Sequence, residues 1–273
     1  MSGFSAEWLR LREPVDEAAR NSELTTELLN WRQRRGSLTV LDLASGAGAN
    51  VRFLAPLLGG EQHWWLVDHD PVLLARSEEI IGPWAAEHGM SLKLDWRLLD
   101  LAHDWGRLDL PEAQLVTASA LLDLVSAEWL KRLARRCGQW RAAVFVVLSY
   151  DGTINWEPIL QGDERMREVV NRHQRTDKGF GPALGPDAAA TLAILLRNLG
   201  YAVMVRPSPW DLGPDQVAMQ TALLEGWVEA ARQIAPEAEE GWAAWRAQRR
   251  RWIERRESRL RVGHWDLFAW RDE

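Results

Sequence analysis

Cysteine is almost absent from this sequence, since Cys137 is the single cysteine among 273 residues. One cysteine excludes an internal disulfide and a cysteine-based zinc cluster, which favours a reducing compartment and a packing role for Cys137. Long apolar runs are also missing, because AAVFVVL and LAILL fall far short of the roughly 20 residues that a membrane span needs. The N-terminal stretch lacks the apolar core of a secretory signal. We therefore expect a cytoplasmic protein with no membrane partner.

An excess of positive charge is missing as well. The chain carries 33 Lys and Arg against 39 Asp and Glu, a formal net charge of −6. This balance makes nucleic acid an unlikely main partner, because phosphate binding depends on clustered excess Lys and Arg. The arginine-rich stretch 246–261 directly follows the acidic segment APEAEEG, so we interpret it as an amphipathic helix whose charge is balanced within the chain. RNA binding by this stretch remains the alternative.

Metal chemistry has little support in the sequence. The histidines His63, His69, His88, His103, His173 and His264 do not pair with Cys137 at a metal-ligand spacing. Zinc sites need such clusters of His, Cys or carboxylate ligands. We predict no metal site.

What the sequence does contain is an alternation of apolar runs and amphipathic helical patterns. Strands are predicted at 38–43, 63–68, 91–97, 114–119, 142–149, 201–206 and, last, 260–273. Residues 5–35 are predicted helical, with Ser5 as N-cap and a break at Pro14. Such alternation predicts an α/β fold with parallel strands and a ligand crevice at their carboxyl ends.

The stretch TVLDLASGAGANVRFL, residues 39–54, reads as a strand, a tight turn and the start of a helix. A dinucleotide-binding turn would use Gly46 and Gly48 and an acidic residue about 20 positions on, which Asp68 provides. The third glycine of that motif is missing, because Val51 stands in its place. A cofactor other than a nicotinamide dinucleotide is therefore favoured.

DLASGAG resembles motif I of the class I S-adenosylmethionine (SAM)-dependent methyltransferases, with Ala44 in place of the first glycine. Asp68, in WLVDHDP, stands where this family binds the ribose hydroxyls, and Asp100, in WRLLDLA, stands where it binds the adenine amino group. Carboxylates suit both tasks because they accept hydrogen bonds from hydroxyls and amines. The resemblance implies SAM as cofactor and a doubly wound, mostly parallel seven-stranded sheet with helices on both faces.

The resemblance also implies a set of cofactor contacts along the strand ends. The set is Asp42, Ala44, Ser45, Gly46, Gly48, Asp68, His69, Asp100, Leu101, Ala118 and Ser119. Asp42 is expected near the methionine amino group, although it could instead bond turn amides. Asp70 and Ser126 are predicted N-caps, and Arg12 and Arg20 are considered as partners of the SAM carboxylate.

Three residues are candidate catalytic groups. Tyr150 and Asp151 end the fifth predicted strand, at the rim of the crevice. His173 shares a helical face with Met166, Val169 and Val170, so it could act as a general base or simply pack.

Additions to the family pattern indicate a single domain with a covered cleft. We expect an N-terminal helical cap at 1–35, a SAM-binding core at 36–211 with a lid insertion near 152–185, a helical insertion at 212–259 and a final strand at 260–273. Such helical insertions forming a lid suit a small polar acceptor. We therefore predict a SAM-dependent small-molecule methyltransferase, monomeric or homodimeric. An RNA methyltransferase or a non-catalytic SAM-binding regulator or scaffold is the alternative.

Overall fold

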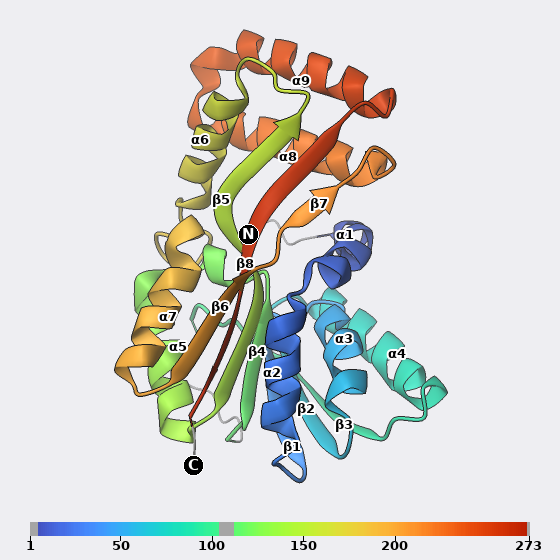
Figure 1. Cartoon of the computed structure of the whole chain (residues 1–273), viewed down its shortest axis with the longest axis vertical. Helices are drawn as coiled ribbons and strands as arrows, with labels where there is room; N and C mark the ends of the chain where they lie inside the picture. Colours follow the sequence, from blue (N-terminus) through green and yellow to red (C-terminus); the bar gives the residue numbers. More distant parts are fainter. Residues whose placement is uncertain (1–4, 104–111, 272–273) are drawn as a thin grey trace.

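The computed structural model describes residues 5–103 and 112–271, which form an α/β fold around one large sheet (Figure 1). The strand order is β3-β2-β1-β4-β5-β8-β6, with a short β7 paired to β8. The strands are β1 Leu38–Leu43, β2 Gln62–Asp68, β3 Leu92–Leu98, β4 Leu115–Ser119, β5 Ala143–Glu157, β6 Ala202–Pro207, β7 Trp210–Leu212 and β8 Arg259–Trp270. Strands β3, β2, β1, β4 and β5 are parallel, whereas β8 runs antiparallel to β5 and β6.

The predicted fold class is confirmed, but the sheet has eight strands where seven were expected. The additional strand, β7, has only three residues and pairs only with β8. A stretch as short as WDL carries no alternation that a sequence pattern could reveal. The predicted final strand is β8, and its last two expected positions, 272 and 273, lie outside the described residues.

The helices are α1 Ala6–Ala19, α2 Ser22–Arg32, α3 Ala49–Leu58, α4 Pro71–Glu87, α5 Ala127–Trp140, α6 Asp163–Gln174, α7 Ala188–Asn198, α8 Val217–Ile234 and α9 Glu239–Glu254. Ser5, Asp70 and Ser126 cap α1, α4 and α5 as predicted, each accepting a backbone N–H. The predicted break at Pro14 is wrong. Pro14 lies inside α1, and the chain breaks at Arg20, whose extended ψ of 134° ends α1 before Asn21 caps α2.

The two faces of the sheet bury different helices because neighbouring strand residues point to opposite sides. Val40 and Leu66 face one core together with Leu28 of α2 and Leu54 of α3. Leu41, Leu43 and Val67 face the other core, which contains Leu130 of α5 and Leu192 of α7. Asp42 lies between Leu41 and Leu43, so its side chain points to the α2–α3 side.

Strands β5 and β8 continue past the rest of the sheet and support α6, α8 and α9 (Figure 1). Their pairing extends to Glu157 and Arg259, with register shifts between Val146 and Ser149 and between Tyr150 and Ile154. The insertion expected near 152–185 therefore starts as strand, and its helix begins only at Asp163. The helices of this extension stand over the carboxyl ends of the parallel strands.

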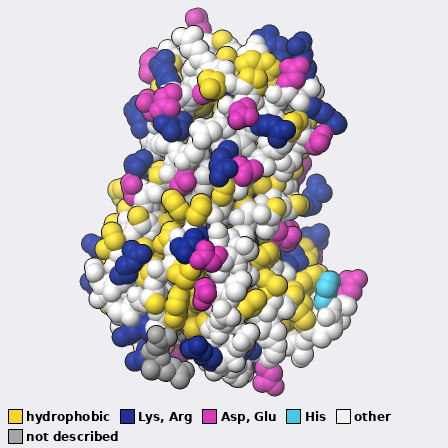
Figure 2. Space-filling view, viewed as in Figure 1, with side chains coloured by type: hydrophobic (Ala, Val, Ile, Leu, Met, Phe, Trp, Pro, Cys, Tyr) yellow, Lys and Arg dark blue, Asp and Glu magenta, His cyan; other side chains and the backbone are white. Residues whose placement is uncertain are grey.

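Arginines of α9 and the following residues pair with carboxylates of the same chain. Arg246 contacts Glu225 at 2.7 Å and Arg256 contacts Asp215 at 3.1 Å. Figure 2 shows basic and acidic side chains interspersed over this helical part of the visible face. The expected intramolecular charge balance of this region is therefore present. No helix within 5–103 and 112–271 combines the length and apolar character needed to cross a membrane.

Candidate active site

The turn after β1 holds three residues in left-handed backbone conformations. Ala44, Gly46 and Gly48 have φ values of 51°, 53° and 80°. A Cβ on Gly48 would lie 2.2 Å from Ile81 Cδ1, so only glycine fits there. Ala44 carries the steric cost of about 1–2 kcal/mol that a left-handed L-residue pays. The tight turn is thus kept despite local strain.

Asp68, at the end of β2, is bonded to this turn. Its Oδ2 accepts Gly46 N at 2.8 Å and its Oδ1 accepts Asp70 N at 3.0 Å. The side chain is buried, with His69 Nδ1 3.4 Å from Oδ1. Each carboxylate oxygen has a second lone pair for a ligand hydroxyl.

Asp100 follows β3 on the same side of the sheet. Burial would raise its pKa, but hydrogen bonds from His103 and from Ala102 N outweigh burial, so the pKa lies below its usual value. These bonds measure 2.9 Å from His103 Nδ1 and 2.8 Å from Ala102 N. Asp100 therefore stays ionised and half-exposed as an acceptor.

Two adjacent cavities lie over these strand ends and share part of their lining. The smaller, of about 120 Å³, is bordered by Asp68, Asp100 and Leu101. The larger, of about 500 Å³, is bordered by Asp42 and Asn50. Both are lined by Leu9 and Arg12 of α1 and by Ala44, Gly46 and Ser119.

The predicted cofactor residues divide accordingly. Nine of them line these two cavities: Asp42, Ala44, Ser45, Gly46, Asp68, His69, Asp100, Leu101 and Ser119. Gly48 instead lies beneath α4, against Ile81. Ala118 is buried within the sheet at 1% exposure and borders neither cavity. These two positions shape the turn and the strand rather than the cavity wall.

Asp42 belongs to a buried polar network under the larger of these cavities. Its Oδ1 accepts Asn50 Nδ2 at 2.8 Å, and Arg20 donates to Asn50 Oδ1 at 2.8 Å. Burial raises the pKa of Asp42 to about 7, against the lowering effects of Asn50 and Arg20. Arg20 also stacks on Phe53 at 4.3 Å. Arg20 therefore supports Asp42 from below, and of the two arginines considered only Arg12 borders the cavities.

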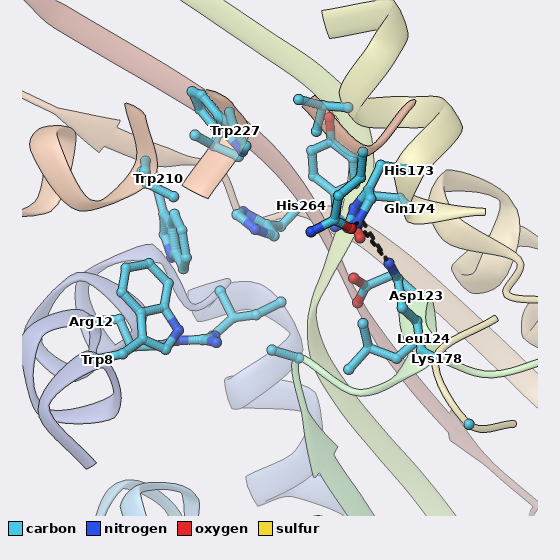
Figure 3. Close-up of a pocket in the computed structure, with 18 of the residues that line it drawn as sticks. Trp8, Arg12, Asp123, Leu124, His173, Gln174, Lys178, Trp210, Trp227 and His264 are labelled. Atoms are coloured by element: carbon cyan, nitrogen blue, oxygen red, sulfur yellow. Dashed lines mark hydrogen bonds between the residues drawn. The ribbon is translucent and has the colours of Figure 1, made fainter. Parts of the chain in front are cut away.

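A third and largest cavity, of about 860 Å³, lies under the helices of the extension (Figure 3). It meets the smallest cavity at Arg12, Ala120 and Leu124, which line both. Its walls are rich in aromatic rings: Trp8, Tyr150, Trp210, Trp227 and His264. The chamber thus adjoins the strand ends and is lined by residues of α1, α6 and α8, while α9 contributes nothing to its lining.

Of the three predicted catalytic residues, the structure brings two to this chamber. The Tyr150 hydroxyl donates to Asn171 Oδ1 at 2.8 Å, and burial, reinforced by Asp151 and Asp123, raises the pKa of Tyr150. Burial and the charge of Lys178 lower the pKa of His173, which keeps its imidazole neutral at pH 7.

Asp151 does not border the chamber, contrary to expectation. Its Oδ1 accepts Thr153 N at 2.7 Å, and its carboxylate lies where a Cβ on Gly263 would be, 2.1 Å from Oδ1. The register shift after Tyr150 turns this side chain toward β8. Asp151 therefore has a structural role in the strand pairing.

Two buried polar residues of the chamber were not singled out from the sequence. Asp123 is 6% exposed and its Oδ1 has no partner among the described residues; burial raises its pKa to about 6. His264 is 5% exposed, and its Nδ1 has no hydrogen-bond partner in the part of the chain that the structure describes; burial and then the charge of Arg12 lower its pKa to about 3. A signal for Asp123 existed, since it is the one charged residue of TASALLDLVS after the fourth strand.

The described residues contain no group of three or more His, Cys, Asp or Glu side chains arranged to hold a metal ion.

Comparison with known proteins finds similarity in structure but not in sequence. No family model matches the chain, and no curated protein matches it by sequence. The YcgJ protein of Bacillus subtilis is similar with a TM-score of 0.50 at 14% identity, over 93% of this chain and 100% of that one. This likeness shows that the two chains share a fold.

A SAM-dependent methyltransferase from Geobacter sulfurreducens, in complex with S-adenosylhomocysteine, is similar with a TM-score of 0.49 at 15% identity, over 100% of both chains. A second such methyltransferase complex, from Thiobacillus denitrificans, gives a TM-score of 0.48 at 14% identity, over 99% of both chains.

Proposed function

We propose that this protein is a SAM-dependent methyltransferase that modifies a small polar molecule. One observation carries the proposal: the acidic and glycine-bearing ends of β1, β2 and β3 border a cleft that shares lining residues with a larger chamber beside it. A cleft for a donor and a chamber for an acceptor, joined at Arg12 and Ala120, are what a two-substrate transfer requires. A fold alone does not specify a function, whereas the chemistry of a site does.

The residues of the cleft fit SAM. Gly46 leaves room for close backbone approach, and the free lone pairs of Asp68 and Asp100 suit the ribose hydroxyls and the adenine amino group. Ser119 and the buried Asp42–Asn50 pair lie where the methionine portion would be held. When bound, SAM supplies an electrophilic methyl group. The protein's own task is to hold the acceptor in line with that group and exclude water.

The chamber supports a small acceptor. Its volume of about 860 Å³ falls within the roughly 300–1,000 Å³ of small-molecule sites. Helices α1, α6 and α8 all contribute to its lining, through Trp8, His173 and Trp227. A chamber of this size can hold a small molecule whole. The single cysteine, buried and free, suits a cytoplasmic location.

The cofactor assignment is tested by calorimetry with S-adenosylhomocysteine. We expect Asp68→Asn to weaken binding by roughly 1–3 kcal/mol, because an ionised acceptor is lost and the new amide group opposes Gly46 N. Asp215→Asn, an exposed aspartate distant from the cleft, serves as the matched control. Unchanged affinity in Asp68→Asn would contradict the ribose assignment, and absence of binding by the unmodified protein would remove SAM altogether.

A turnover assay distinguishes a methyltransferase from a non-catalytic SAM-binding regulator. Incubation with methyl-labelled SAM and a fractionated metabolite extract should transfer label to a small product. Cofactor binding without any labelled product would favour the non-catalytic alternative.

A further inference from the structure

The chamber contains a carboxylate that the protein itself leaves incompletely bonded. Asp123 lies on the short helix Leu122–Leu124, and within the described residues it forms no ion pair and its Oδ1 no hydrogen bond. Burying such an oxygen is costly unless a ligand satisfies it. Since a carboxylate only accepts, the missing partner is a donor, either an N–H or an O–H group.

The surroundings of Asp123 favour a cationic donor. Three indoles line the chamber, Trp8, Trp210 and Trp227, and aromatic faces attract cations. His264 is neutral. Arg12 pairs with Asp16, with Arg12 Nε 2.7 Å from Asp16 Oδ2, and its charge also lowers the pKa of Asp123, although the two form no ion pair within the described residues. An ammonium group would thus meet one open carboxylate and the indoles of Trp8 and Trp227, since the Arg12 guanidinium already lies over the Trp210 ring at 5.3 Å.

Lys178 provides the complementary charge. Figure 3 shows its side chain at the same end of the chamber as Asp123. Its ammonium contacts the His173 ring at 3.3 Å and Thr176 Oγ1 at 2.9 Å, and it makes no ion pair within the described residues. Asp123 and Lys178 therefore both line the chamber, where the charge of each favours the charged form of the other although they form no ion pair within the described residues.

We propose that the chamber binds a small zwitterion, with its amine on Asp123 and its anionic group on Lys178, and that the amine nitrogen is the atom methylated. The proposal rests on the proposed function, which it extends to a substrate class. Asp123 follows Ala120 by three positions in the chain, and Ala120 lines both the chamber and the cofactor cleft.

The chemistry assigned to Asp123 is proton acceptance. The ammonium form of the substrate transfers one proton to the carboxylate, which frees the nitrogen lone pair. That pair forms the N–C bond to the methyl carbon as the S–C bond breaks, with the bonding electrons staying on sulfur. The products are the methylated ammonium, S-adenosylhomocysteine and a proton on Asp123 that returns to water.

The experiment compares amines with hydroxyl analogues that keep the same anionic group. Calorimetry is done on the full chain with S-adenosylhomocysteine present. The probes are β-alanine against β-hydroxypropionate, γ-aminobutyrate against γ-hydroxybutyrate, and para-(aminomethyl)benzoate against para-(hydroxymethyl)benzoate. In at least one pair, we expect the amine to bind about tenfold or more tightly than its analogue, as a charge-assisted hydrogen bond allows.

Two variants assign the preference to its residues. Asp123→Asn should abolish the amine preference, whereas Lys178→Met should weaken both members of a pair by a similar factor, about tenfold. Asp215→Asn should change neither. Unaltered affinity of Asp123→Asn for S-adenosylhomocysteine verifies its fold, because Asp123 borders neither cofactor cavity.

Equal or tighter binding of the hydroxyl analogues, a preference that survives in Asp123→Asn, or failure of every pair to bind would each overturn the proposal. In all these cases, retained S-adenosylhomocysteine binding leaves the methyltransferase function standing. Loss of that binding in the unmodified protein would instead remove the proposed function itself.

Discussion

Asp42 illustrates at the residue scale how burial changes the chemistry of a predicted contact. The sequence predicted its position at the end of β1, and the structure places it there with 0% exposure. A hydrogen bond from Asn50 and the charge of Arg20 do not outweigh its burial, so its pKa rises from 3.8 to about 7. Folding therefore requires Asp42 to retain a proton over a pH range in which the unfolded chain has lost it.

This coupling predicts a pH dependence of stability. The stability cost of Asp42 is absent below its unfolded pKa of 3.8 and grows as pH rises towards the folded value of about 7. Asp42→Asn cannot ionise, so its stability relative to the unmodified protein should increase by up to about 1.4 kcal/mol per pH unit in that range. Urea unfolding at several pH values between about 4.5 and 7.5 measures this difference.

Three other buried carboxyl groups have raised pKa values and also make stability depend on pH: Asp16, Asp123 and Asp266. Their contributions are present in both proteins, so they cancel in the difference between the variant and the unmodified protein. Asp215→Asn is the exposed control and should run parallel to the unmodified protein. If the unfolding free energy of Asp42→Asn changed with pH in parallel with that of the unmodified protein, the raised pKa of Asp42 would be contradicted.

At the scale of elements, the extension is held together by a buried arginine of α9. Arg249 has a fully buried side chain that pairs with Asp163 of α6 and donates to Pro158 O at 2.7 Å. Its guanidinium lies 4.9 Å from the ring of Trp156 and 5.2 Å from that of Trp252. One side chain thus joins α9, α6 and the far end of β5.

We expect Arg249→Leu to destabilise the protein by about 3–5 kcal/mol, because it leaves Asp163 without its buried partner. Thermal and urea unfolding followed by circular dichroism would measure this loss. Arg250→Leu, its exposed neighbour paired with Glu254, should cost less than about 1 kcal/mol. Similar losses in both variants would show that Arg249 contributes no more than a surface charge.

The sequence predicted the core strands and several caps because these follow from local patterns. The apolar runs at 38–43 and 114–119 predicted β1 and β4. Asp70 and Ser126 cap the helices for which they were predicted. The second half of β5 was missed because YDGTINWE combines turn-forming and polar residues. Its strand conformation depends on pairing with β8 more than 100 residues away, as between Asn155 and Arg261.

The candidate site was predictable to the same extent. Asp68 and Asp100 could be predicted to lie in the crevice because the carboxyl ends of parallel strands lie at the same edge of the sheet. The chamber was not predictable, since Trp8, Asp123 and His264 come from three separate parts of the chain. The prediction placed Asp151 at the crevice wrongly, because the register shift after Tyr150 turns its side chain toward β8.

At the scale of the whole molecule, α1 borders each of the three cavities described above. Arg12 lines all three of them, and Leu9 lies 3.4 Å from the Cβ position on Gly46. The helix is tied to α3 by the ion pair of Glu13 with Arg52, at 2.5 Å. Ligand occupancy of the cleft should therefore affect how often α1 separates from the core.

Hydrogen exchange tests this coupling. Saturation with S-adenosylhomocysteine at about 100 times its Kd should slow exchange in 6–19 by up to about a hundredfold, if release of the ligand requires α1 to open. Exchange in 239–254 should change little, since α9 borders none of the cavities. Slowing confined to the turn at 44–48 would contradict the role of α1 as a cover.

The position of β8 between β5 and β6 has a consequence for how this protein is made. Val144 pairs with Ala269, so a ribosome must synthesise well over a hundred further residues before the apolar side chains of β5 acquire this neighbour. Until then the nascent chain presents an open, hydrophobic sheet edge, the kind of surface that promotes aggregation and recruits chaperones. Overproduction in a foreign host should therefore benefit from slow translation and low temperature.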